Sequence, residues 1–301
     1  GPTASGKTEA AKILFDNFPI DIISVDSAQI YRGFNIGTAK PIPEELTKYP
    51  HHLLDFKGPC ERYSVNEFKI DVEKVSSQIY KRNKIPILVG GTMMYFNSLV
   101  KPLNEMPEST PEARKNVEKD LDMHGLDEMY KKLSKIDPTI VKKIKGTDKQ
   151  RIMRALEVYY ITGKPLSFYH KPKMKPDTNY KLLKIALIPS DRALLNSIIE
   201  VRVNDMLKNG FIEEVESLIK NNPSLDLTYP ALRSVGYKQV YEHIIGIISF
   251  DDLTEKIVIA TRQLAKRQMT WIRGMDNLLM IDPFDKNFDI TITNSVRKFL
   301  E

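Results

Sequence analysis

The chain has 301 residues, of which 42% are apolar and 28% are charged, and its formal net charge is +6. This composition is typical of a soluble globular protein that forms one large domain, or a core domain with a smaller insertion. The longest apolar runs are well short of the roughly 18 residues that a membrane span requires, so we expect no transmembrane helix and no membrane association.

Cysteine and histidine usage narrows the classes further. The single cysteine, Cys60, excludes an internal disulfide and a thiolate zinc cluster, which fits a reducing compartment. The five histidines have no metal-binding spacing, and the sequence does not open with the basic and apolar regions of a secretion signal. We therefore predict a cytoplasmic protein.

The sequence opens on GPTASGKT, which satisfies the phosphate-binding pattern G-x-x-x-x-G-K-[ST] in full. Apolar residues at helical spacing follow it and predict a helix. The glycines of the loop let backbone N–H groups converge on phosphate oxygens at the positive end of that helix. Lys7 adds a point charge, and the Thr8 hydroxyl is placed to coordinate Mg²⁺. A buried strand normally delivers the chain to such a loop, and we expect one before Gly1. The predicted phosphate-binding residues are Gly1, Pro2, Thr3, Ala4, Ser5, Gly6, Lys7 and Thr8.

Short apolar runs without the alternation of a half-exposed strand are predicted to be buried strands. They lie at 21–25, 85–89, 184–188 and 278–281. Helical stretches separate these runs: 64–82 combines a capping box, Ser64 with Glu67, with an apolar stripe, and another helix extends from about 191 to 208. Alternation of strand and helix predicts an α/β fold with a parallel sheet flanked by helices.

The pattern changes between residues 101 and 180 to short helices with no strand candidate. Pro111 and Pro138 fit first helical turns, while Asp148 caps and Gly163 ends a further helix. This stretch is predicted to be an all-helical insertion. The predicted boundaries are 1–105 with 181–301 for the core domain and 106–180 for the insertion.

Positive charge concentrates in 129–181, which holds fourteen Lys or Arg and four acidic residues, a net +10 that leaves −4 for the rest of the chain. We call this segment the basic block. Such a concentration indicates a polyanionic partner gripped by one region. A lysine-rich solvated surface explains the same count equally well.

The groups near the loop indicate which phosphate-containing molecule it binds. The strand at 85–89 leads into Gly90-Gly91-Thr92 rather than an acid, so the only acid that ends a predicted strand is Asp26. Three roles are open for Asp26: a metal-side carboxylate as in a nucleotide kinase, a base acting on a bound acceptor, or the N-cap of the next helix.

Six separated motifs agree on one family. They are GPTASGKT, SVDSAQIYRGFNIGTAKP, LVGGTMMYF, DKQRIMRALEVYYITGKP, ALRSVGYKQ and ATRQLAKRQMTWIRG. In this order and spacing they resemble the bacterial tRNA dimethylallyltransferases over essentially the whole chain. The resemblance implies a P-loop NTPase-like core with a helical insertion, and Mg²⁺ as cofactor. It also implies transfer of a dimethylallyl group from dimethylallyl diphosphate to the exocyclic N6 amine of the adenosine immediately 3′ of the anticodon.

The resemblance makes the opening loop a holder for the diphosphate of a prenyl donor, whose negative charge grows as the allylic carbon–oxygen bond breaks. It implies that the Thr92 hydroxyl lies near the bridging oxygen and that the forked Arg233 guanidinium binds the diphosphate. By themselves these residues also fit a strand-end turn and a surface ion pair. Asp26 becomes the base that removes a proton from the adenine amine. The implied catalytic residues are Lys7, Asp26, Thr92 and Arg233.

The acceptor base must leave the stack of the anticodon loop, so the resemblance implies a protein that holds the tRNA anticodon stem-loop from several sides. Gln150, Arg151 and Arg154 share one face of a helix whose Ile152 side faces the core. Basic residues surround Trp271, which fits either a stacking or a core position. The implied tRNA-contacting residues are Asp26, Ser27, Ala28, Gln29, Thr92, Arg114, Gln150, Arg151, Ile152, Met153, Arg154, Arg233, Ser234, Val235, Gly236, Tyr237, Lys238, Lys266, Arg267 and Arg273.

Two other classes of protein stay open. A P-loop kinase or an adenylate isopentenyltransferase would act on a free nucleotide, which requires no extended basic surface. A non-catalytic RNA-binding protein would keep the loop as a relic. The zinc-finger extension of eukaryotic relatives cannot form with one cysteine. Nothing implies an obligate protein partner, so we expect a monomer.

Overall fold

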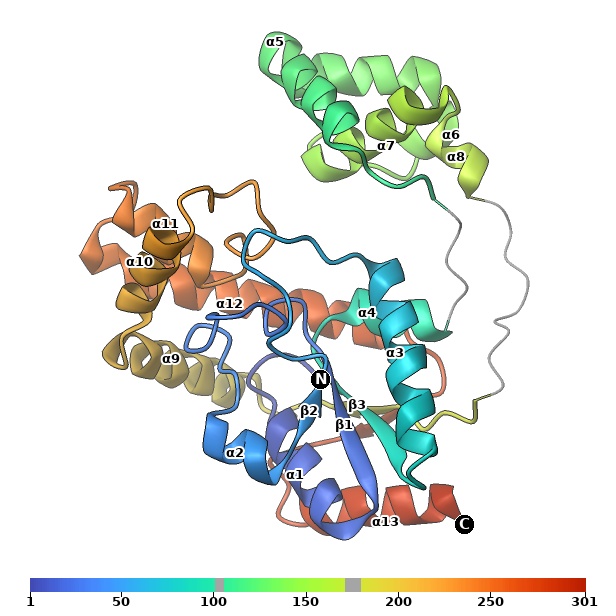
Figure 1. Cartoon of the computed structure of the whole chain (residues 1–301), viewed down its shortest axis with the longest axis vertical. Coiled ribbons are helices and arrows are strands. Elements are labelled where there is room, and N and C mark those ends of the chain that lie inside the picture. Colours follow the sequence, from blue (N-terminus) through green and yellow to red (C-terminus); the bar gives the residue numbers. More distant parts are fainter. Residues whose placement is uncertain (101–105, 171–179) are drawn as a thin grey trace. The chain divides into compact units, whose positions relative to one another are not determined.

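The computed structural model describes residues 1–100, 106–170 and 180–301 (Figure 1). The chain divides into two compact units: unit 1 is Gly1–Leu99 with Asn179–Glu301, and unit 2 is Val100–Thr178. These boundaries differ by a few residues from those predicted from the sequence. Part of the basic block, namely Lys171, Lys173, Lys175 and Asp177, lies outside the described residues.

Unit 1 contains parallel β-strands. They are β1 (Ile20–Val25), β2 (His51–His52), β3 (Ile85–Gly90), β4 (Ile185–Leu187) and β5 (Leu279–Ile281). One sheet has the order β2-β1-β3, and β4 pairs with β5 in a second sheet. The four predicted strands are confirmed. The sequence did not predict β2, because two histidines form no apolar run.

Helices cover both faces of the larger sheet, which explains why its strands are apolar throughout. Side chains alternate between the faces of a strand. Accordingly, Ile20 and Ile22 pack with α1 (Lys7–Asn17), while Ile23 and Val25 pack with α3 (Val65–Tyr80). The α/β fold class predicted from the sequence is confirmed. The other helices beside the strands are α2 (Pro43–Lys48), α4 (Met93–Val100) and α13 (Phe288–Leu300).

A helical layer completes unit 1 and has its own core. It consists of α9 (Arg192–Lys208), α10 (Phe211–Asn221), α11 (Tyr237–Ile244) and α12 (Phe250–Arg273). Phe211 and Tyr237 pack edge to face, with ring centroids 4.9 Å apart, and Tyr237 also contacts Phe34 from the loop after β1. The chain between β1 and α2 is thereby fixed against this layer.

Unit 2 is helical throughout its described part, as predicted. Its helices are α5 (Pro111–Ile136), α6 (Pro138–Val141), α7 (Lys149–Thr162) and α8 (Leu166–Tyr169). The predicted termini are confirmed: the Asp148 carboxylate accepts from the Arg151 N–H at the start of α7, and Gly163 ends α7 with a φ of 67°. Gly125, with a φ of 75°, kinks α5 into two segments.

Candidate functional site

The opening loop closes on itself at the N-terminus of α1. Ala4 and Gly6 adopt positive φ angles of 62° and 68°, the left-handed region that glycine adopts most readily. The buried Ser5 hydroxyl donates to the Pro2 carbonyl at 2.8 Å. The turns leave the loop's last N–H groups at the positive end of α1, which is the geometry of a phosphate cradle.

A buried glutamine of α12 ties this loop to the end of β3. The Gln268 Oε1 accepts from the Thr3 N–H at 2.8 Å, and its Nε2 donates to the Gly91 carbonyl, also at 2.8 Å. Gln268 is only 8% exposed, so both hydrogen bonds are shielded from water. The sequence prediction did not include Gln268. The helical spacing of Ala265, Gln268 and Ile272 could have placed it on the buried face of α12.

Lys7 is a partly buried cation within the loop. Its ammonium donates to the Pro2 carbonyl at 2.5 Å. Burial lowers the pKa of Lys7 to about 8, an effect that the negative charge of Asp26 opposes and the positive charge of Arg202 increases. The three charges therefore act on one another within a single site.

The parallel pairing of β1 and β3 brings Asp26 and Thr92 together. Val25 lies opposite Gly90 in the ladder, and the Thr92 N–H donates to the Val25 carbonyl at 3.1 Å. The Thr92 hydroxyl accepts from the Ser27 N–H at 3.0 Å. Both predicted residues thus stand at the carboxyl edge of the sheet, where ligands bind in open α/β folds.

One oxygen of Asp26 has a local role. Asp26 Oδ1 accepts from the Ala28 N–H at 2.8 Å and from the Gln29 N–H at 3.2 Å. The following residues form a turn rather than a helix, so Asp26 caps that turn, and the helix N-cap alternative is wrong. These bonds orient the carboxylate and use Oδ1 alone.

Arg202 of α9 is a site residue that the sequence did not predict. Its guanidinium is largely desolvated, which lowers the pKa of Arg202, and the charge of Asp26 acts in the opposite direction. The Arg202 Nη2 reaches the Thr38 carbonyl at 3.5 Å, and Gln29 Nε2 donates to the same carbonyl at 3.1 Å. The sequence signal was weak because Arg202, like Arg192 in the same helix, resembles any exposed helical cation.

Arg233 lies near Tyr31. Its side chain is exposed. Burial raises the pKa of the nearby Tyr31 hydroxyl to about 12, and the positive charges of Arg62 and Arg233 act in the opposite direction. No ion pair joins Arg233 to another described residue. Its predicted contact with the diphosphate stays a prediction, and Arg202 is a further arginine, whose charge acts together with those of Asp26 and Lys7.

The residues predicted to contact tRNA differ in accessibility. Ile152 and Tyr237 are fully buried in the cores of their units, as the helical pattern indicated for Ile152, so direct side-chain contact with tRNA conflicts with their packing. The backbone at Gly236 is also buried. Exposed side chains belong to Ser27, Gln150, Arg151, Arg233, Lys238, Lys266, Arg267 and Arg273, and partly exposed ones to Asp26, Ala28, Gln29, Thr92, Arg114, Met153, Arg154, Ser234 and Val235.

Trp271 is 46% exposed on α12, so the core alternative for it is wrong. The neighbouring Lys266, Arg267 and Arg273 are exposed as well. Arg262 instead pairs with Glu200 of α9 at 2.9 Å and helps to hold the two helices together. The last two turns of α12 therefore carry three exposed cations and one exposed aromatic ring.

Within unit 2, one buried carboxylate organises two of the predicted arginines. Glu157 is 7% exposed; one of its oxygens accepts from Arg154 Nη1 at 3.2 Å and the other from the Ser109 hydroxyl, which in turn accepts from Arg114. Arg154 also donates to the Pro107 carbonyl at 2.6 Å. Arg151 is different, because its side chain is 66% exposed and pairs only loosely with Asp148, at 3.4 Å.

Oxygen donors near the loop fit a magnesium ion. Mg²⁺ keeps several waters and takes one or two protein ligands together with substrate phosphates. Thr8 is exposed in the first turn of α1, at the place where such a hydroxyl is needed. Over the described parts of the chain, no group of three or more His, Cys, Asp and Glu side chains could hold a metal. The fit is therefore to an ion shared with a phosphate ligand, not to a protein cage.

Within residues 1–100, 106–170 and 180–301, no helix has both the length and the apolar character needed to cross a bilayer.

Comparison with known proteins gives one consistent result. The family model described as IPP transferase matches residues 29–275. A tRNA dimethylallyltransferase of Legionella pneumophila (strain Paris) is 46% identical over 302 residues, which cover 100% of this chain and 96% of the relative. One from Neisseria gonorrhoeae is 44% identical over 284 residues, covering 94% and 91% respectively.

Solved structures agree with these sequence matches. The full-length tRNA isopentenylpyrophosphate transferase of Bacillus halodurans has a TM-score of 0.71 and 32% identity, over 100% of this chain and 94% of that one. A eukaryotic dimethylallyltransferase described as acting on tRNA has a TM-score of 0.76 and 27% identity, over 95% and 73% of the two chains.

The lowered pKa of Lys7 predicts a pH-dependent affinity for diphosphate. The anion binds the protonated amine, so affinity is full below pH 8 and falls as the pH rises through the pKa of about 8. Isothermal titration with inorganic diphosphate should give a dissociation constant that rises by up to about tenfold between pH 7 and pH 9. Lys7→Arg, which keeps its charge, should flatten this dependence. An affinity of the parent that stays constant over that range would contradict the assignment.

Proposed function

Because the chain belongs to the IPP transferase family, we propose that it transfers a dimethylallyl group from dimethylallyl diphosphate to tRNA, releasing diphosphate. The proposed acceptor is the exocyclic N6 amine of the adenosine immediately 3′ of the anticodon. The observation that carries the proposal is the meeting of three charged groups, Lys7, Asp26 and Arg202, where the phosphate loop adjoins the carboxyl edge of the sheet. Two cations suit a departing diphosphate, and the carboxylate suits a proton leaving the acceptor.

The donor half of the reaction uses the loop. Negative charge grows on the diphosphate as the allylic carbon–oxygen bond breaks, and fixed donors aimed at that charge stabilise the transition state. The N–H groups of residues 4–8 supply dipoles, and Lys7 and Arg202 supply charges. The Thr92 hydroxyl, held by the Ser27 backbone, lies at the same edge and suits the bridging oxygen. Thr8 would hold Mg²⁺, which when bound neutralises part of the charge on the diphosphate.

The acceptor half uses Asp26. An adenine amine is a weak nucleophile because its lone pair is delocalised into the ring, so attack requires loss of a proton to a positioned base. In the proposed step, the N6 nitrogen forms a bond to the allylic carbon, the carbon–oxygen electron pair leaves with diphosphate, and the N6 proton passes to the Asp26 carboxylate. The turn contacts at Oδ1 leave Oδ2 as the candidate proton acceptor.

Three groups of exposed side chains support a tRNA substrate. The first is Gln150 with Arg151 on α7, and the second is Lys266, Arg267, Trp271 and Arg273 on the last two turns of α12. The third is Arg233 with Lys238 at the start of α11. We propose that these groups contact the phosphates of the anticodon stem-loop and that the protein acts as a cytoplasmic monomer. A free nucleotide would require none of them.

The choice between tRNA and a free nucleotide can be tested directly. Incubation with dimethylallyl diphosphate labelled in the prenyl group should transfer the label to tRNA and not to AMP. A tRNA lacking adenosine next to the anticodon serves as the negative control. Label that enters AMP alone would favour an adenylate isopentenyltransferase, and ATP hydrolysis without prenyl transfer would favour a kinase-like enzyme.

Asp26→Asn tests the proposed base while keeping the local fold. The amide oxygen of Asn can still accept from Ala28 and Gln29, so the turn stays, but the side chain no longer accepts a proton at neutral pH. We expect kcat to fall at least about a hundredfold with little change in tRNA affinity. The matched control is Asp191→Asn, since Asp191 caps α9 with the same i to i+2 and i+3 contacts. Full activity of Asp26→Asn would remove Asp26 from the mechanism.

Arg151→Gln tests the contact of unit 2 with RNA. The plot of log dissociation constant against log salt concentration should lose about one unit of slope, because one phosphate contact disappears. Lys131→Gln is the matched control: Lys131 is 67% exposed and pairs at i,i+3 with Glu128, much as Arg151 is 66% exposed and pairs with Asp148. An equal loss of slope in both variants would indicate general charge rather than a contact surface at α7.

A further inference from the structure

Glu214 anchors the chain that follows the candidate active site. One of its oxygens, Oε2, accepts from the Asn35 N–H at 3.0 Å and the Ile36 N–H at 2.8 Å. The other, Oε1, accepts from the Gly37 N–H at 3.4 Å and from the Tyr237 hydroxyl at 2.7 Å. A single carboxylate in the first turn of α10 thus receives four donors, three of them consecutive backbone amides.

This arrangement pairs the backbone N–H groups at the start of residues 35–39, a segment that we call the anchor loop. Three adjacent N–H groups lie in a segment outside any strand or helix, and a single carboxylate accepts from all of them. The loop packs tightly at Gly37. A Cβ on Gly37 would lie 2.2 Å from the Phe211 ring and 2.6 Å from the Tyr237 ring.

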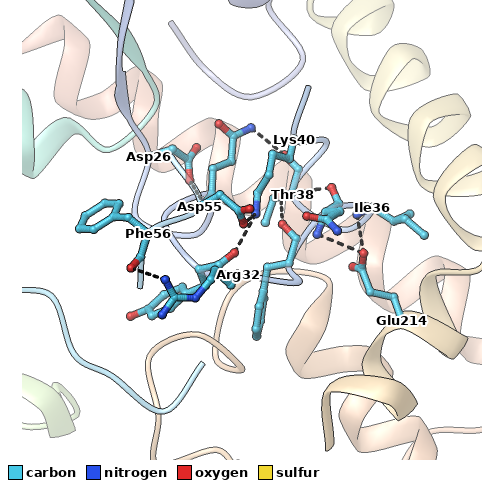
Figure 2. Close-up of polar contacts among 12 residues, drawn as sticks. Asp26, Arg32, Ile36, Thr38, Lys40, Asp55, Phe56 and Glu214 are labelled. Carbon is cyan, nitrogen blue, oxygen red and sulfur yellow. Dashed lines mark hydrogen bonds and ion pairs between the residues drawn. The ribbon is translucent and has the colours of Figure 1, made fainter. Parts of the chain in front are cut away.

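The opposite side of the anchor loop faces the candidate site. The Thr38 carbonyl accepts from Gln29 Nε2 at 3.1 Å and from Arg202 Nη2 at 3.5 Å, and the Ala39 carbonyl accepts from the same Gln29 nitrogen at 3.3 Å. Figure 2 shows Glu214 on one side of this segment and Asp26 on the other, with Ile36 and Thr38 between them. The loop therefore presents its N–H groups to Glu214 and its carbonyls to two side chains beside Asp26.

A second tie holds the far end of the segment. The Lys40 ammonium, whose side chain is 4% exposed, donates to the Tyr31 carbonyl at 2.7 Å and pairs with Asp55 at 2.5 Å (Figure 2). Lys40 thus fixes the end of the anchor loop to the chain near β1, and Glu214 fixes its beginning to the helical layer. The orientation of the intervening carbonyls depends on both ends.

We propose that Glu214 is a positioning residue for the transfer reaction: by holding residues 35–37, it aims the Thr38 and Ala39 carbonyls that orient Arg202 and Gln29 beside Asp26. This inference rests on the proposed function. Glu214 contacts neither substrate, and its effect reaches the reaction through the backbone of the anchor loop. Displacing a substrate-orienting group by about 1 Å is enough to cost a large factor in rate.

Glu214→Gln is the informative variant because it keeps the size of the side chain. The Tyr237 hydroxyl can rotate to accept from an amide NH₂, but a backbone N–H cannot accept. The amide must therefore turn its NH₂ group toward the Gly37 N–H or toward those of Asn35 and Ile36, which separates the facing groups. We expect kcat over KM for dimethylallyl diphosphate to fall at least about tenfold. The dissociation constant of tRNA should stay within about twofold, because phosphate contacts remote from the anchor loop supply most of that affinity.

Two further variants separate positioning from general charge and stability effects. Glu213→Gln removes the neighbouring acid, which is exposed in the same first turn of α10, and should leave kinetics unchanged. Tyr237→Phe removes one of the four donors and should give a smaller loss than Glu214→Gln. All rates are measured at least about 10 °C below the melting temperature of each variant, so that every protein is fully folded.

A double-mutant cycle tests whether Glu214 acts through Arg202. Arg202→Lys keeps the positive charge but loses the forked guanidinium that the Thr38 carbonyl orients. A disturbed anchor loop should therefore affect the reaction less in this background. We expect Glu214→Gln to cost at least about threefold less in the Arg202→Lys background than in the parent protein. Equal costs in both backgrounds, or a Glu214→Gln variant with parental kinetics, would overturn the proposal while leaving the proposed function intact. A parent protein that transfers nothing to tRNA would overturn both.

Discussion

The site depends on the parallel pairing of β1 with β3 up to their last residues. Val25 lies opposite Gly90, and a Cβ at Gly90 would lie 2.1 Å from the Val25 carbonyl oxygen, so only glycine permits this approach. The pairing brings Asp26 and Thr92, which are 66 positions apart in the chain, to one edge. Gln268 then joins Gly91 to the opening loop. Three segments of the candidate site are thereby fixed relative to one another, two by backbone pairing and the third by the Gln268 side chain.

Burial of opposite charges gives this edge its chemical character. A lone buried carboxylate or ammonium is strongly disfavoured, but Lys7, Asp26 and Arg202 lie near enough to act on one another. Two cations and one anion leave an excess of positive charge, which suits a diphosphate dianion or trianion. Glu214 and Lys40 carry out the supporting task, since each ties one end of the segment whose carbonyls contact Arg202 and Gln29.

The two units differ in what their sequence patterns revealed. In unit 2, proline at N1, the Asp148 cap and the Gly163 terminus are local signals, and each predicted the structure correctly. The same local patterns did not predict which arginines are free to contact a partner, because an arginine on a helix face can form an ion pair within the protein. Arg154 does so with Glu157, whereas Arg151 stays exposed, although both share one face of α7.

The sequence by itself determined the α/β class, the four longer strands, the helical insertion and the family, since each depends on short-range periodicity or on contiguous motifs. Only the tertiary structure decided that Arg202 lies near Asp26, that Gln268 joins the loop to β3, and that Glu214 anchors residues 35–37. These contacts join residues separated by more than 170 positions along the chain. Arg202 and Glu214 have no periodicity that distinguishes them from exposed helical residues, and the helical spacing of Gln268 indicates burial but not its partners. The partners of all three are defined by how the helices pack and not by any local pattern.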